Sequence, residues 1–270
     1  MRHTFVLAFA LALGLSLAAA PSASAQAQDF THDGRIWTAF NFQGPIYGDL
    51  FFIGDLGWRM FLGDIAPLTP QQPIVRGALA WRFFNSRDTG AMYAAFGYAW
   101  QPNWARPGLV GFTDEHRTYA SWHWDYTNQE TGIRLSFRVR FEVRFRHPDP
   151  HPLELGFRLR EQFRLLIPLE SSRQLFFVFW DELFENMADA GHVGYQGVDG
   201  MGNAATLYTS TWENAGFDQN RAFLGLGVQL VPSVFRLEAG YLNQWSRRPA
   251  NMAGDAMNHV FMLQTYLNWS

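Results

Sequence analysis

The chain has 270 residues, a formal net charge of −3 and no cysteine. A near-neutral charge gives no reason to expect a nucleic-acid partner, and the lack of cysteine excludes disulfides, thiol chemistry and an acylated N-terminal cysteine. All 21 basic residues are arginine, and aromatic residues make up 17% of the chain, including 25 Phe and 11 Trp. Such a composition suits a protein whose aromatic rings lie at membrane interfaces.

Residues 1–25 have the pattern of a secretory signal peptide. Arg2 supplies a positive charge, residues 4–20 form an apolar run, and residues 23–25 (ASA) form a cleavage site before Gln26. A membrane-anchoring helix is the alternative, but the small residues before Gln26 and the lack of a later helix-length apolar run argue against it. We therefore expect an exported protein with a polar lead over residues 26–36 and a single domain over residues 37–270.

Apolar and polar side chains then alternate along eleven segments. Alternation has a period of two, which only a β-strand converts into two distinct faces. No helical period and no interdomain linker interrupts the series. The segments are residues 37–43, 50–62, 75–83, 92–100, 117–126, 133–146, 153–169, 174–186, 221–230, 235–245 and 259–269.

The segment at residues 133–146 is the clearest of the series. Every odd position in it is large and apolar, and every even position is arginine, serine or glutamate. Two later segments depart from this regularity, because Glu161 falls on an apolar face and the alternation slips at Trp180 and Asp181. We expect a β-bulge at both places, or an interfacial position for Glu161.

Short and long connections alternate between these segments. Residues 85–90, 127–132, 170–173 and 231–234 are short, whereas residues 63–73, 101–116, 187–220 and 246–258 are longer. Outer-membrane barrels alternate short periplasmic turns with longer extracellular loops in the same way. Both termini are then expected in the periplasm, which requires an even number of crossings. The count becomes ten if residues 37–43 do not cross, and twelve if one further crossing is hidden.

Two all-β folds compete for this pattern. A soluble sandwich would place the arginine faces in water, and it would leave apolar faces rich in Phe, Leu and Trp as large exposed patches. In a closed barrel the apolar faces meet lipid, and the arginines meet glutamates across the lumen. We therefore predict an all-β fold, a single transmembrane antiparallel β-barrel of 10–12 strands.

Three short motifs resemble a bacterial outer-membrane family that is catalogued as domain of unknown function 2490. They are residues 182–186 (ELFEN), residues 217–221 (FDQNR) followed by Gly225 and Gly227, and residues 238–244 (EAGYLNQ). His259, at the head of the last segment, also fits the family pattern. The resemblance implies a location in the outer membrane of a Gram-negative bacterium and supplies no established activity. We expect outer-membrane lipids, periplasmic chaperones and the barrel-insertion machinery as partners.

The inward faces supply the candidate site. Rings of arginine favour anions in pores, so these residues could line a narrow, anion-preferring diffusion channel for small solutes. They could equally form a salt-bridge network that fills a plugged structural barrel, since guanidinium groups bind carboxylates through two parallel hydrogen bonds. The expected lumen-lining residues are Arg134, Arg138, Arg140, Glu142, Arg144, Glu154, Arg158, Arg160, Arg164, Glu182, Arg221, Arg236 and Glu238.

An outer-membrane lipid hydrolase is the alternative function. It would need a serine and a histidine within hydrogen-bond reach at the barrel rim, with an orienting acid or amide. His259 has the outward parity, and Ser246 and Asn258 bracket the preceding loop. No nucleophile motif supports them, so we expect a non-enzymatic protein with no catalytic residue.

Two acidic stretches could hold a divalent cation, because oxygen ligands suit calcium. They are Asp114, Glu115 and His116, and the stretch at residues 199–203. Neither has the spacing of a known cation-binding loop. We therefore interpret both as solvated loop residues and expect no metal and no cofactor.

Overall fold

A computed structural model describes residues 31–62, 69–104, 112–148, 154–188, 195–198, 204–208, 216–247 and 255–269, and every regular element in these ranges is a β-strand. None of these residues forms a helix that could cross a membrane. The strands are β1 (Thr31–Tyr47), β2 (Leu50–Leu62), β3 (Thr69–Ser86), β4 (Gly90–Trp104), β5 (Phe112–Thr127), β6 (Arg134–Pro148), β7 (Glu154–Pro168), β8 (Leu175–Ala188), β9 (Tyr195–Val198), β10 (Ala204–Tyr208), β11 (Gly216–Val231), β12 (Phe235–Ser246) and β13 (Ala256–Asn268).

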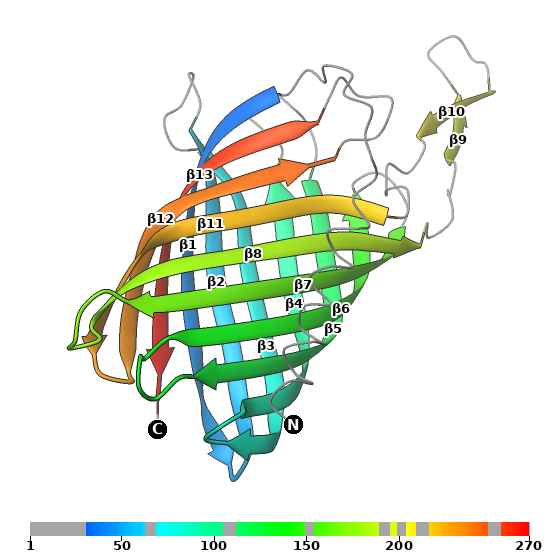
Figure 1. Ribbon diagram of the computed structural model, residues 1–270. Helices are drawn as coiled ribbons and strands as arrows, with labels where there is room; N and C mark the ends of the chain where they lie inside the picture. The colour runs from blue at the N-terminus through cyan, green and yellow to red at the C-terminus, as the bar shows by residue number, and fades with distance from the viewer. Residues whose placement is uncertain are drawn as a thin grey trace.

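Eleven of these strands close into one barrel (Figure 1). The other two, β9 and β10, come between β8 and β11 in the sequence and form a separate two-stranded sheet. Sequence neighbours pair in antiparallel fashion around the barrel, with β8 beside β11. The single barrel of 10–12 strands is thus confirmed.

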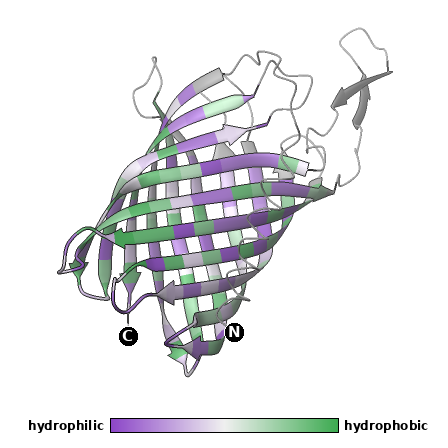
Figure 2. Ribbon diagram, viewed as in Figure 1, coloured by the Kyte–Doolittle hydropathy of each residue, from purple (hydrophilic) through white to green (hydrophobic). Residues whose placement is uncertain are grey.

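Alternation along each strand separates the two surfaces of the barrel. Figure 2 shows hydrophilic and hydrophobic positions alternating along the strands. Large apolar side chains such as Phe96, Trp81 and Phe261 are 68%, 60% and 54% exposed on the outside. By contrast, Glu142 and Glu238 are 1% and 0% exposed. Most of the charged side chains are therefore inside, and large apolar side chains cover most of the exterior.

The barrel closes through a parallel pair, and this makes its strand number odd. β1 lies parallel to β13, from Thr31 opposite Ala256 to Gln43 opposite Asn268. The segment at residues 37–43 therefore belongs to a full-length strand of the barrel, β1. The strand number is within the expected range, but the expectation of an even number is wrong, because an odd number closes when the first and last strands run in the same direction.

The two ends of the barrel differ in their connections. The short-turn end, as we call it, has the tight turns β1–β2, β3–β4, β5–β6, β7–β8 and β11–β12, and the long-loop end has the other connections. β1 begins at the long-loop end, whereas β13 ends at the short-turn end. Both ends of the chain were expected on one side; the first and last described strands instead begin and end at opposite mouths of the barrel, because of the same parallel closure. β1 also begins at Thr31, within the stretch expected as a polar lead.

The outside of the closing seam is packed around a glycine. A Cβ atom built on Gly44 would lie 2.0 Å from the Trp269 indole, so only glycine leaves room for this ring. The Trp269 ring also stacks on Phe42 at a centroid distance of 6.4 Å, and its backbone nitrogen donates to the Gln43 oxygen at 3.1 Å. The last aromatic residue therefore anchors the end of β13 to β1.

The lumen contains apolar clusters as well as charges. One buried cluster crosses the inner faces of β7, β8, β11, β12, β13 and β1, and a second lies on β2–β5. Among their members, Trp180 stacks on Phe223 at 5.3 Å, and Phe176, Val178 and Leu242 are fully buried. These side chains fill part of the barrel interior and leave a smaller space for the charged residues.

Neither of the β-bulges expected from the sequence, at Glu161 and at Trp180–Asp181, is present. Glu161 pairs in regular register with Val139 and Leu183, and Asp181 pairs regularly with Phe163 and Ala222. The alternation slips because the inner face of β8 is itself apolar up to Trp180. Asp181 lies on the outer face, where its carboxylate accepts a hydrogen bond from the Asn220 amide at 2.6 Å.

Candidate functional site: an arginine-lined lumen

A buried carboxylate, Glu142 on β6, lies at the centre of the charged network. Its Oε1 accepts a hydrogen bond from Nη1 of Arg160 at 2.6 Å and lies 3.7 Å from Nη1 of Arg140. Its Oε2 lies 3.8 Å from Nη1 of Arg117. Arg140 and Arg160 face each other directly across the β6–β7 register, so this carboxylate offsets a repulsion between like charges.

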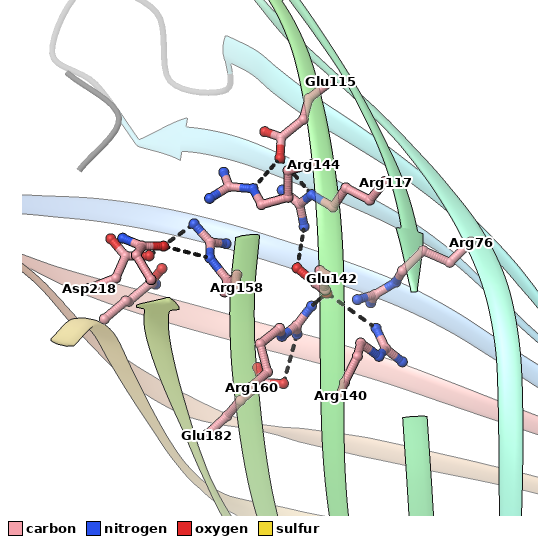
Figure 3. Close-up of polar contacts among 12 residues, drawn as sticks. Arg76, Glu115, Arg117, Arg140, Glu142, Arg144, Arg158, Arg160, Glu182 and Asp218 are labelled. Carbon is pink, nitrogen blue, oxygen red and sulfur yellow. Dashed lines mark hydrogen bonds and ion pairs between the residues drawn. The ribbon is translucent and has the colours of Figure 1, made fainter. Parts of the chain in front are cut away.

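Two further carboxylates extend this network in both directions (Figure 3). Glu182 accepts from Arg160 and from Arg138, each at 2.7 Å. Arg160 therefore bridges Glu142 and Glu182 with its two terminal nitrogens. Glu115 accepts from the Nε atoms of Arg117 and Arg144, also at 2.7 Å. The network thus connects β5, β6, β7 and β8 through charge-assisted hydrogen bonds.

The network lies in the long-loop half of these strands. Glu115 is near the start of β5, and Glu182 lies just past the middle of β8, on the side of the long-loop end. An ion pair between Arg158 and Asp218, 2.9 Å apart, joins β7 to β11 on the same side. The side chains in this half of the lumen are almost fully buried, with Arg160 only 3% exposed.

A smaller cluster surrounds Glu238 nearer the short-turn end. Its Oε1 binds Arg164 of β7 and lies 2.9 Å from Nε of Arg236 on its own strand. Both guanidinium groups stack on the Tyr266 ring, at 4.8 Å and 4.4 Å from its centroid. The cluster therefore joins β7, β12 and β13 across the lumen.

Aromatic rings support many of the luminal arginines. Phe184 lies under Arg160 and Arg221, at 4.6 Å and 4.4 Å, and Tyr119 lies under Arg140 at 4.1 Å. A guanidinium group is planar and weakly hydrated, so it can stack on a ring while its edge binds a carboxylate. A lysine ammonium cannot do both, which gives a physical reason for a chain whose basic residues are all arginine.

A cavity of about 440 Å³ occupies the lumen beside this network. Its lining includes Gln43, Thr127 and Asn268, which lie near the short-turn ends of β1, β5 and β13. It also includes Arg160, Glu182 and Arg221 of the network. The cavity therefore extends from the short-turn end to the salt bridges in the long-loop half.

Positive charge dominates the cavity wall. Among the described residues, nine arginines and three acidic residues line it. Asp55 neutralises Arg76 through a bidentate contact at 2.8 Å, and Glu182 serves the salt-bridge network. Glu142 and Glu238 are not among the lining residues but pair with lining arginines, and the wall itself has more guanidinium groups than carboxylates.

Most of the residues predicted to line the lumen can be placed. The structure brings Arg138, Arg140, Glu142, Arg144, Arg160, Glu182 and Arg221 into one network or its direct neighbours, and it groups Arg164, Arg236 and Glu238 in the smaller cluster. Arg158 pairs with Asp218, and Arg134 lies over Phe176 at 5.0 Å. Glu154 begins β7, but its side chain lies outside the described residues.

The prediction missed several members of the site. Asp55, Arg59 and Arg76 on β2 and β3, and Glu115 and Arg117 on β5, all lie on inner faces. The sequence signal that could have identified them is their position on the polar, inward-facing side of their own strands. It was outweighed in the sequence by the longer arginine run of residues 133–146.

The serine and histidine residues considered for hydrolysis do not meet. His259 is on the outside, where its Nδ1 is 2.5 Å from the Tyr241 hydroxyl, while Ser246 accepts a hydrogen bond from Gln244. Asn258 is inside the barrel and 2% exposed. A serine–histidine contact that the sequence did not single out lies in the lumen instead, with Ser121 Oγ and His123 Nε2 2.9 Å apart.

The first proposed cation site is divided between the two surfaces of β5. Glu115 binds arginines in the lumen, whereas Asp114 and His116 contact each other on the outside at 3.1 Å. The stretch at residues 199–203 lies outside the described residues. Within the described part of the chain, no group of three or more acidic or histidine residues could hold a metal ion.

Comparison with known proteins places the chain in a family without an assigned activity. The profile of the family described as "Protein of unknown function (DUF2490)" matches residues 34–255. An uncharacterized protein from Methylorubrum extorquens is 28% identical over 238 residues, covering 88% of each chain. No solved structure matches. Because the profile matches most of its length, the chain belongs to the DUF2490 family.

Proposed function

We propose that this protein is an integral outer-membrane barrel of a Gram-negative bacterium, with a closed lumen and no enzymatic activity of its own. The observation that carries the proposal is the distribution of the side chains. Phe96, Leu79 and Leu226 are more than half exposed on the outer surface, while most of the arginines are inside. Water would penalise such an exterior, whereas acyl chains would solvate it.

Polar aromatic tips on the outer surface mark the two edges of a membrane-sized band. Near the long-loop end, the Tyr98 hydroxyl contacts His116, whose ring also contacts Asp114. Near the short-turn end, Trp124 stacks on Tyr126 and donates to the Thr89 oxygen at 2.8 Å. From His116 to Tyr126, β5 rises roughly 26 Å along the axis at ~3.4 Å per residue and a tilt of about 40°, close to the ~25 Å apolar band of such barrels.

The buried contacts in the long-loop half of the lumen favour a closed barrel rather than a diffusion channel. Glu142, Arg160 and Glu182 are at most 3% exposed, and they hold one another across the interior. Opening a path there would break several charge-assisted hydrogen bonds among desolvated groups. In the orientation usual for outer-membrane barrels, the short-turn end and its cavity face the periplasm.

Cell fractionation and bilayer recordings test both parts of the proposal. We expect the mature chain to remain with outer membranes after an alkaline wash and to give no conductance steps in planar bilayers. Recovery in the soluble periplasmic fraction would refute the membrane location. Conductance steps that grow with salt concentration would refute the closed lumen and favour an anion-preferring channel.

A further inference from the structure

We propose that the luminal cavity is a binding site for a small, multiply charged oxyanion that bears phosphate or carboxylate groups. Entry of such a ligand from the periplasm rests on the orientation proposed above. Binding itself depends only on the cavity, so it can be measured on the purified barrel. A volume of about 440 Å³ falls within the range of about 300–1,000 Å³ that is typical of small-molecule sites.

Arg140 and Arg138 on β6 line the cavity and carry buried hydrogen-bond donors without acceptors among the described residues. Arg140 is 6% exposed, and its Nε and Nη1 donate to no described residue, since Nη1 is 3.7 Å from Glu142. Arg138 binds Glu182 through Nη2, but its Nε has no acceptor among the described residues. Buried donors without acceptors are costly, and an oxyanion would supply the acceptors.

Ser121 and His123 lie opposite these arginines in the β5–β6 register. Ser121 faces Arg140, and His123 faces Arg138. The His123 ring is held by stacking on Tyr93 at 4.4 Å and by its contact with Ser121. A histidine that acts as a general base becomes an imidazolium when it takes the proton. The two facing guanidinium groups would repel this positive charge, so Ser121 and His123 suit hydrogen bonding to an anion better than acyl transfer.

The other wall adds further positive charge. Arg59 on β2 stacks on Trp37 at 4.1 Å and donates to the neutral Gln72 amide oxygen. Arg221, which also lies 3.6 Å from Glu182, approaches the same indole at 5.1 Å. The ligand space therefore has arginine on two sides, as expected for an anion with at least two charged groups. Trp37, which also lines the cavity, places a fluorescent reporter beside it.

Titration of the purified mature protein in an uncharged detergent tests the site. Tryptophan fluorescence and calorimetry would be recorded with inorganic pyrophosphate, with citrate, and with spermidine as a polycation, at constant ionic strength. We expect saturable binding of pyrophosphate, citrate or both, and none of spermidine. The tighter anion identifies the ligand class as phosphate or carboxylate. Absence of saturable binding by both anions, or equal binding of spermidine, would overturn the proposal.

Two variants locate the binding site. We expect Arg140→Gln and Arg138→Gln each to weaken anion binding by about tenfold or more, the value of a hydrogen bond to a charged group. Arg87→Gln is the matched control, because Arg87 is exposed in a turn at the same end of the barrel. An equal loss in the control, or full affinity in both lumen variants, would place binding outside the cavity and overturn the proposal. If a lumen variant does not fold, the wild-type titrations decide.

Discussion

Replacing Glu142 by glutamine is the sharpest test of the luminal network. The substitution keeps the shape of the side chain but removes the charge that faces Arg160, Arg140 and Arg117 at 2.6–3.8 Å. Loss of one partner from a buried ion pair costs about 3–5 kcal/mol, because the opposite charge is left uncompensated. Since Arg160 keeps its contact with Glu182 at 2.7 Å, we expect a loss in the free energy of unfolding of about 3 kcal/mol.

Urea unfolding of the refolded barrel, followed by tryptophan fluorescence, measures this loss by linear extrapolation. Glu130→Gln makes the same chemical change in an exposed turn and should leave the stability unchanged. Combining Glu142→Gln with Arg140→Gln should recover part of the loss, with a coupling energy of about 1 kcal/mol or more. A Glu142→Gln protein within about 0.5 kcal/mol of the wild type would show that the network does not stabilise the barrel, and our reasoning would fail.

Three further predictions concern other features of the barrel. Arg160→Lys should lower the free energy of unfolding by about 2 kcal/mol in the same urea assay, because an ammonium cannot bridge Glu142 and Glu182 while stacking on Phe184; wild-type stability would contradict the bridging role. Phe96→Arg should destabilise the barrel in lipid vesicles by about 2–4 kcal/mol, since Phe96 faces outward at 68% exposure. The control, Thr89→Arg in a turn, should be nearly neutral. Equal effects of the two substitutions would mean that Phe96 does not contact acyl chains. Phe40 and Thr265 lie opposite each other in the parallel pairing of β1 with β13, so a short thiol cross-linker should join cysteines placed at these two positions in this cysteine-free chain. Cysteines placed at Phe40 and Phe261 are the control and should not be joined. The reverse result would refute the register of β1 and β13.

Alternation in the sequence is sufficient to assign most side chains to a surface. In residues 133–146, the strict period of two puts Arg138, Arg140 and Glu142 inside, and the structure agrees. This information is local, because the face of each residue depends only on its own strand. The partners of a luminal arginine are non-local, since Arg160 meets Glu182 and Glu142 through the registers of three strands. Alternation does not contain those registers.

Two features could not be read from the sequence for different physical reasons. The parallel pairing of β1 with β13 joins the ends of the barrel chain, and no local pattern distinguishes it from an antiparallel closure with one strand more or fewer. The apolar lumen at Phe176, Val178 and Trp180 is hidden because both faces of β8 are apolar there, so the period of two disappears. What remained looked like a bulge, although the backbone register is continuous.

The parallel pairing of β1 with β13 also determines at which mouth of the barrel each described end of the chain lies. Because β1 starts at one mouth of the barrel and β13 finishes at the other, a peptide tag joined directly before Thr31 and a second tag joined after Trp269 would lie in different compartments in the outer-membrane location proposed above. An intact cell would then expose just one of the two tags to an added antibody. An even-stranded barrel would present both tags on the same side, so this molecule carries an intrinsic two-sided label for its own orientation.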